Sequence, residues 1–221
     1  MNMRHLAPFA LVALLSACAS GPPPAEWQLS AQGALREAVL AYLVGNDRVA
    51  NAEFTRARAD IASTGRPDLL ARAELVRCAA RMASLDIDTC PAYQALAADA
   101  APPERAYATY LSGRWQGLDA NLLPPQHRAV PGSSGAANVL PGITDPLAQL
   151  VAAGALLQAG QLSPAGVATA VDTASAQGWR RPLLAWLGVQ LQRAEAAGQG
   201  DEAQRVRRRM ALVTQGGVRA P

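Results

Sequence analysis

Apolar residues recur at helical spacing along almost the whole chain from Ser30 onward, and short glycine turns interrupt the pattern repeatedly. Ala50, Phe54, Ala57 and Ile61, for example, follow one another at intervals of four, three and four residues, which places them on one face of a helix. No run of alternating or β-branched residues predicts a strand. The sequence therefore predicts an all-α fold of antiparallel helical hairpins, either a superhelix or an irregular bundle.

The periodicity predicts about nine helices in two halves, 27–112 and 145–221. A helix that opens with Pro67 carries two apolar lines, so we expect it to lie at the centre of the fold, covered on both sides. Periodicity is lost over 113–144, where prolines and glycines are frequent, and this segment predicts a long loop between the halves. The other helices are expected at 30–44, 47–65, after Thr89, after Pro103, from Asp145 to about 158, and at 163–177, 181–197 and 201–214.

The segment GNDRVANAEFTRA resembles the turn and second helix of a tetratricopeptide repeat. Gly45 lies at the turn, Ala50 and Ala57 lie where two helices would touch, and Phe54 lies at the gap between neighbouring helices. A similar segment near the C-terminus has Arg207 in place of the aromatic residue. The resemblance implies a tetratricopeptide-like stack of hairpins, although antiparallel hairpins of an alanine-rich bundle would give the same spacing.

The first residues have the pattern of an export signal. Arg4 precedes an apolar run from Leu6 to Leu15, which is about half of the ~20 residues that a membrane-spanning helix needs. A positive start, a short apolar run and small residues before a cleavage site are typical of secretory signals. We therefore expect residues 1–17 to be a signal peptide that is cleaved from the protein.

The end of this signal, Leu15-Ser16-Ala17-Cys18, resembles the lipobox of bacterial lipoproteins. The resemblance implies that Cys18 carries diacylglycerol, that the preceding peptide is removed, and that the new amine is acylated with a fatty acid such as palmitate. Two or three acyl chains would hold the protein on a membrane, because each buried CH₂ contributes about 0.8 kcal/mol. Ala19 is not the aspartate that retains such lipoproteins at the inner membrane, so the expected location is the periplasmic face of the outer membrane. Three successive prolines in 18–26 predict a stiff tether.

Cys78 and Cys90 are the two cysteines left once Cys18 is acylated. Export would place them in an oxidising compartment, so we expect them to form a disulfide. The bond would close a loop of about 13 residues and contribute roughly 3 kcal/mol in the chain-entropy model. Because Cys78 lies about two turns before its helix ends, the connection SLDIDT must run back along that helix to bring the sulfur atoms together.

Few residues have the types and spacing that catalysis requires. His127 is the one histidine beyond the signal peptide, and its place in a proline-rich segment predicts a solvated loop residue. Asp86 and Asp88 are two carboxylates close together in a turn, and we expect Asp88 or Thr89 to cap the following helix. No spacing indicates a zinc site or an activated nucleophile. The sequence predicts no catalytic residue, no metal and no cofactor.

Four arginines of the last predicted helix avoid its apolar line: Arg205, Arg207, Arg208 and Arg209. We interpret them first as a solvated face. The alternative is that Arg205, Arg208 and Arg209 form a patch for anionic lipid or for a partner. The formal net charge of the chain is only +3, which does not indicate nucleic acid as a partner.

These features predict a lipid-anchored envelope protein that acts by binding an envelope protein partner. It is similar in kind to the helical-repeat lipoproteins that assist assembly of the bacterial envelope. An enzyme acting on peptidoglycan, with its site in 113–144, and a purely structural spacer are the alternatives. In the binding interpretation, 113–144 is the segment that we expect to lie across the binding face or to extend from it.

Overall fold

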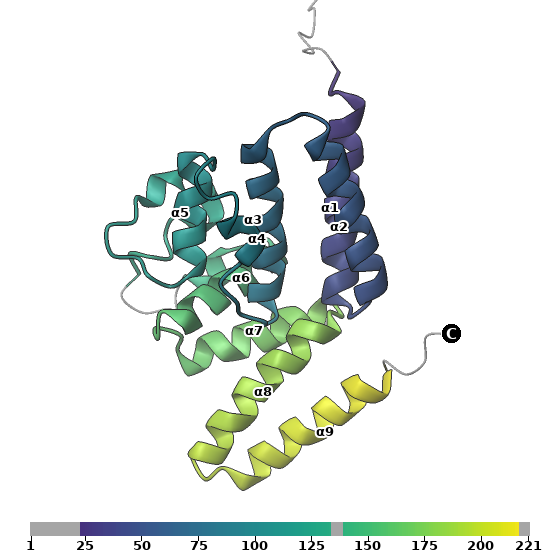
Figure 1. Ribbon diagram of the computed structural model, residues 1–221. Helices are drawn as coiled ribbons and strands as arrows, with labels where there is room; N and C mark the ends of the chain where they lie inside the picture. The colour runs from purple at the N-terminus through teal and green to yellow at the C-terminus, as the bar shows by residue number, and fades with distance from the viewer. Residues whose placement is uncertain (1–22, 134–138, 217–221) are drawn as a thin grey trace, which may run out of the picture.

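The computed structural model describes residues 23–133 and 139–216, and the lipobox with Cys18 lies outside these ranges. The described residues form nine α-helices and three short 3₁₀ helices with no strand, which confirms the predicted all-α fold (Figure 1). None of these helices combines the length and the apolar character that crossing a membrane requires. The α-helices are α1 (Glu26–Leu43), α2 (Asp47–Ala62), α3 (Pro67–Ala83), α4 (Pro91–Gln94), α5 (Pro102–Leu111), α6 (Pro146–Gln158), α7 (Pro164–Ala176), α8 (Arg180–Ala196) and α9 (Gly200–Gly216).

The first helix begins earlier than the sequence predicts. α1 starts at Glu26, at the end of the segment expected to be a tether, rather than at residue 30. Ala25 is the N-cap residue and has no capping side chain, but its backbone N–H donates to Gln28 Oε1 at 3.2 Å. Gln28 therefore supplies half of a capping box, which stabilises the start of α1. The sequence pattern did not indicate this start, because its N-cap position has none of the usual capping residues Ser, Thr, Asp and Asn.

Helices that follow one another in sequence mostly pack side by side: α1 against α2, α6 against α7, α7 against α8, and α8 against α9. α3 departs from this order, because its main partner is α6, which lies beyond the segment 113–144. Figure 1 shows the α1–α2 hairpin beside α3 and the α8–α9 hairpin projecting from the rest of the fold. The predicted central position of the helix that opens with Pro67 is thus confirmed.

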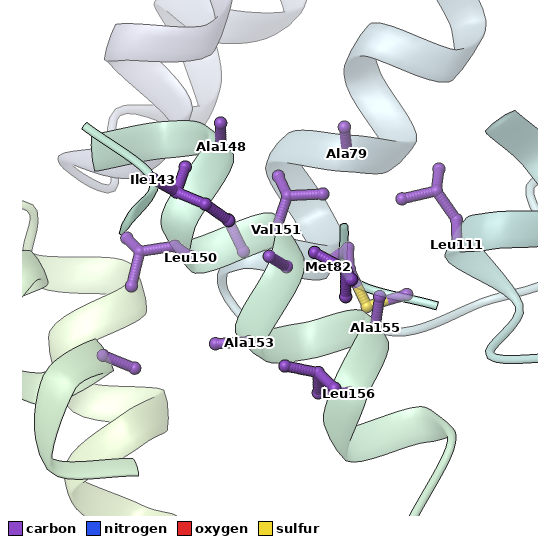
Figure 2. Close-up of a cluster of buried hydrophobic side chains, with 14 of the residues drawn as sticks. Ala79, Met82, Leu111, Ile143, Ala148, Leu150, Val151, Ala153, Ala155 and Leu156 are labelled. Atoms are coloured by element: carbon purple, nitrogen blue, oxygen red, sulfur yellow. The ribbon is translucent and has the colours of Figure 1, made fainter. Parts of the chain in front are cut away.

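The main core lies where α3 crosses α6, and Figure 2 shows Met82 of α3 among apolar side chains of α6. Gly154 lies at this crossing. A Cβ atom added to Gly154 would lie 2.6 Å from the carbonyl oxygen of Met82 and 2.8 Å from its Sδ atom. The absence of a side chain therefore allows the two helices to approach closely.

Two arginines at the start of α8 bind the C-terminal end of α1. Arg180 donates to the carbonyl oxygen of Val44 from Nε at 3.1 Å and from Nη2 at 2.7 Å. Arg181 donates from Nε to the carbonyl oxygen of Tyr42 at 2.8 Å, and its guanidinium lies 4.2 Å from the centroid of the Tyr42 ring. Carbonyl groups in the last turn of a helix lack partners within the helix and carry partial negative charge, so these cations cap α1 from a distant part of the chain.

The same helix also binds the end of α3. Trp186 of α8 is fully buried, and its Nε1–H donates to the carbonyl oxygen of Ala83 at 3.0 Å. The indole thereby fills the core and satisfies a carbonyl group at the end of α3. α8 therefore holds the C-terminal ends of α1 and α3 at fixed positions relative to each other.

Cys78 and Cys90 lie at disulfide distance, with their Cα atoms 6.0 Å apart, which confirms the predicted pairing. The chain returns along α3 because Arg81 holds both nearby carboxylates: it donates to Asp86 at 2.9 and 3.1 Å and forms an ion pair with Asp88 at 2.6 Å. The hydrogen bonds from Arg81 also lower the pKa of Asp86 below its usual range. The two ion pairs thus bring Cys90 back towards Cys78.

The prediction that Asp88 or Thr89 caps the following helix is wrong. The N-cap residue of α4 is Cys90, whose backbone is left-handed at φ 52° and which makes no capping bond through its side chain. The carboxylate of Asp88 does not cap α4, because it pairs with Arg81 and accepts a hydrogen bond from the backbone N–H of Cys90 at 2.8 Å.

We expect the variant Gly154→Ala to be less stable than the wild type by about 1 to 3 kcal/mol, because the added methyl group must push α6 away from Met82. Gly188→Ala in α8 is the matched control. A Cβ atom there meets nothing within 4 Å, so the substitution should leave stability unchanged or raise it by up to about 1 kcal/mol. Urea unfolding followed by circular dichroism measures both. Equal stability of the two variants would contradict the close crossing.

Candidate functional site

The predicted basic face of the last helix is exposed along α9: Arg205, Arg207, Arg208 and Arg209. Glu202 forms an ion pair with Arg205, and Glu195 of α8 forms one with Arg207. Arg208 and Arg209 have no ion-pair partner within 23–133 and 139–216. The arginines lie on the solvated side of α9, since Ala203 and Val206 are its buried residues.

The prediction of a solvated His127 is wrong, because only 2% of this residue is exposed. His127 ends a 3₁₀ helix (Pro125–His127), and its ring packs beside Tyr107 and Tyr110 of α5, at centroid distances of 5.7 and 5.0 Å. Its Nδ1 atom lies 3.2 Å from the hydroxyl of Tyr110. The proline-rich segment thus folds back onto the helices instead of extending into solvent.

His127 is neutral at physiological pH. Burial lowers the pKa of His127 from 6.5 to about 4, and the charge of Asp145 opposes this effect more weakly. Burial also raises the pKa of Tyr107 and of Tyr110 above the ordinary value for tyrosine. An uncharged histidine beside two uncharged phenols packs as an aromatic cluster, and the one hydrogen-bonded neighbour of its ring in the described chain is Tyr110.

A concave surface lined mainly by apolar side chains runs between α1 and α3. This α1–α3 groove has a volume of about 840 Å³, with the start of α6 at its base. Two of its leucines are unusually exposed for residues in helices, Leu29 at 57% and Leu40 at 42%. The side chains that form its apolar walls include Trp27, Leu35, Leu40, Leu69, Val76 and Leu147.

The segment 113–144 extends this surface. A second cavity of about 420 Å³ lies between α3, α5 and the stretch Leu122 to Pro125, and it shares Arg72 and Val76 with the α1–α3 groove. Tyr107 forms part of its wall. The stretch from Leu122 to Pro125 therefore lies beside the groove.

The charged groups of the α1–α3 groove are mainly positive. Arg36 of α1 and Arg72 of α3 lie on its two walls. Arg72 donates to Oε1 of the buried Glu104 from Nε and Nη2, both at 2.7 Å, and yet 64% of its side chain is exposed. The acidic residue of the lining, Asp145, caps α6 by accepting from the backbone N–H of Ala148 at 2.7 Å. The groove thus offers positive charge along an apolar surface.

Sequence reasoning missed this groove. Three residues of the predicted apolar stripe of α1 line the groove, Leu35, Val39 and Leu43, whereas the residues that α1 buries are mainly alanines. Large apolar residues outside the predicted stripe, Leu29 and Leu40, are the signal that could have indicated a wider apolar face.

A third cavity, of about 740 Å³, lies beside the disulfide and has mixed polar and apolar walls. Cys78, Asp88 and Cys90 meet there, with their potential ligand atoms within 4.8 Å of one another, and they are the one group of metal-ligand types that the described residues bring together. The two sulfur atoms are bonded to each other and offer no thiolate. Asp88 alone remains, which is too few ligands for a zinc site.

We expect the burial of His127 to make the protein less stable in acid. The unfolded chain binds a proton near pH 6.5 and the folded protein only near pH 4, so the unfolded state gains protons first as the pH falls. The full effect is roughly 3 kcal/mol, of which about 2 kcal/mol should be lost between pH 7 and pH 4.5. In His127→Gln, which keeps a polar group beside Tyr110, the loss over this interval should be smaller by that amount. Urea unfolding at both pH values measures it, and equal losses in the two proteins would contradict a buried neutral His127.

Comparison with known proteins assigns no family to this chain, because no family model, no curated protein and no solved structure matches it. The function of the α1–α3 groove is therefore inferred from the residues that line it. Those residues form an apolar groove with an arginine on each wall, next to the segment by which the chain enters the fold.

Proposed function

We propose that this protein is a lipid-anchored lipoprotein on the periplasmic face of the bacterial outer membrane, and that it holds a segment of an envelope protein in the α1–α3 groove. The apolar groove carries this proposal. Monomeric proteins seldom expose contiguous apolar patches of this kind unless they bind something there. The exposure of Leu29 and Leu40 within a helix that is otherwise well packed supports a surface kept for a partner.

The proposed anchor lies close to the groove. Pro24 is part of the groove lining and is six residues after Cys18, so a fully extended chain between them spans about 20 Å at most. A partner in the groove would therefore lie near the surface of the membrane that holds the acyl chains. This arrangement suits the assembly or maintenance of membrane complexes better than the capture of distant proteins.

We propose binding rather than catalysis as the activity. The α1–α3 groove presents leucines, two tryptophans and two arginines, which hold a partner by apolar contact and by charge. His127, the residue on which an enzyme in 113–144 would depend, is packed beside Tyr107 and Tyr110, away from the groove lining.

The anchor is tested by Cys18→Ser. We expect this variant to lose acylation and to accumulate as precursor with its signal peptide, because a serine hydroxyl does not replace the thiolate in the transfer of diacylglycerol. Metabolic labelling with a fatty acid and fractionation of membranes measure both effects. Processed, labelled Cys18→Ser protein in the membrane fraction would contradict the anchor.

Binding in the groove is tested in living cells with the photo-crosslinking residue p-benzoylphenylalanine at position 40. We expect the full-length protein to form a discrete adduct with an envelope protein at this position. The matched control places the same residue at Gln204, which is exposed on α9 and lies far from the groove lining. Adducts of equal pattern and yield at both positions, or none at position 40, would contradict the proposed function.

A further inference from the structure

We infer that the occupant of the α1–α3 groove is an amphipathic helix of a membrane protein, with an apolar stripe against the groove and carboxylates facing Arg36 and Arg72. This inference rests on the proposed function, because it names the partner of the same groove. Four properties of the described residues support it: the backbone chemistry of the walls, their length, their charge and their position near the tether.

The backbone chemistry of the groove favours a helix over an extended peptide. Extended peptides are usually held by hydrogen bonds to the edge of a sheet. The described ranges contain no strand, and the two long walls are the flanks of α1 and α3, whose backbone groups are bonded within each helix. An occupant must therefore satisfy its own backbone hydrogen bonds, as a helix does.

The length of the apolar wall fits a helix of four to five turns. The lining residues of α1 extend from Trp27 to Leu43, which at 1.5 Å per residue is about 24 Å. A helix of about 16 residues has the same length. Apolar side chains at positions i, i+3 or i+4, and i+7 of such a helix would meet the leucines of the groove.

The charge of the walls selects an acidic helix. Arg36 is exposed and has no ion-pair or hydrogen-bond partner among the residues that the structure describes, so its guanidinium is available. Arg72 keeps most of its side chain exposed although it binds Glu104. Carboxylates along both edges of the occupant would pair with these two groups.

The same charge argues against a second copy of this chain as the occupant. The helix that projects from the fold and could reach another molecule is α9 (Figure 1), and its exposed side carries arginines. Placing Arg208 and Arg209 beside Arg36 and Arg72 would bring like charges together. The short reach from Cys18 to Pro24 favours instead a partner that is itself held in the membrane.

The test uses the lipidated full-length protein in neutral detergent and three fluorescein-labelled 18-residue peptides designed to be helical. One has a leucine stripe with glutamates on both edges, the second has the same stripe with lysines, and the third has the glutamates but a scrambled stripe. Fluorescence anisotropy, with protein-free detergent as the blank, measures binding. We expect the glutamate-edged peptide to bind at least tenfold more tightly than the lysine-edged peptide, and the scrambled peptide not to bind.

Three variants test whether the glutamate-edged peptide binds in the α1–α3 groove. Leu40→Glu, at a position already 42% exposed, should abolish binding of the glutamate-edged peptide while circular dichroism stays unchanged. Arg36→Glu should lower the preference for glutamate over lysine at least tenfold. Arg209→Glu on α9 changes the net charge equally and should leave the preference as in the wild type.

Equal binding of the glutamate-edged and lysine-edged peptides, binding that survives Leu40→Glu, or no binding at all would overturn the inference. Self-association of the wild type that Leu40→Glu abolishes, measured by light scattering, would identify a second copy as the occupant and also overturn it. If no peptide binds while the adduct at position 40 still forms in cells, the inference of an acidic helix is wrong and the proposed function stands. If no peptide binds and no adduct forms, the proposed function is wrong as well.

Discussion

The hold of α8 on the C-terminal ends of α1 and α3 is the contact on which the rest of the architecture depends. Arg180 and Arg181 bind carbonyl groups at the end of α1, and Trp186 binds one at the end of α3. The α1–α2 hairpin also meets α3 directly, through a small cluster that contains Ala31, Ile61 and Ala73. An ion pair between Arg58 of α2 and the buried Glu74 of α3, and the Arg77 guanidinium over the Phe54 ring, add to these contacts. α8 therefore fixes the C-terminal end of α1, and the direct contacts with α3 fix the rest of the hairpin.

This arrangement explains how an apolar groove persists without collapsing. α1 and α2 pack closely against each other, with Ala34 and Ala57 fully buried, so part of the apolar surface of the hairpin is covered without α3. A cavity of about 280 Å³ on another side of α1 also lies between the hairpin and α3, and it shares Leu35, Val39 and Val76 with the α1–α3 groove. The interface between the hairpin and α3 therefore leaves open space beside its direct contacts. Apolar side chains that line this space are available to a partner.

Helical periodicity was sufficient to predict the nine α-helices of the described residues. The expectation of export to an oxidising compartment was sufficient to predict that Cys78 pairs with Cys90. The buried position of His127 was not predictable in this way. Its segment has no period, and its burial depends on aromatic residues of α5 that lie some twenty residues earlier in sequence. The groove was not predictable for a related reason. Its lining comes from helices that are far apart in sequence, α1, α3 and the start of α6, whereas a sequence pattern reports one helix at a time.

The proposed anchor also bears on the two interpretations of the α9 arginines. α1 begins next to the proposed tether and ends at α8, and at 18 residues it is about 27 Å long, more than the tether can span. The α8–α9 hairpin projects beyond that far end (Figure 1). With the acyl chains of Cys18 in the lipid, the start of the groove at Pro24 and Trp27 is the part nearest to the anchor, whereas the α8–α9 hairpin that carries Arg208 and Arg209 lies beyond the other end of α1. This geometry favours a solvated face on α9 over a patch for the anchoring membrane, and it leaves the α1–α3 groove as the surface best placed to meet a membrane protein.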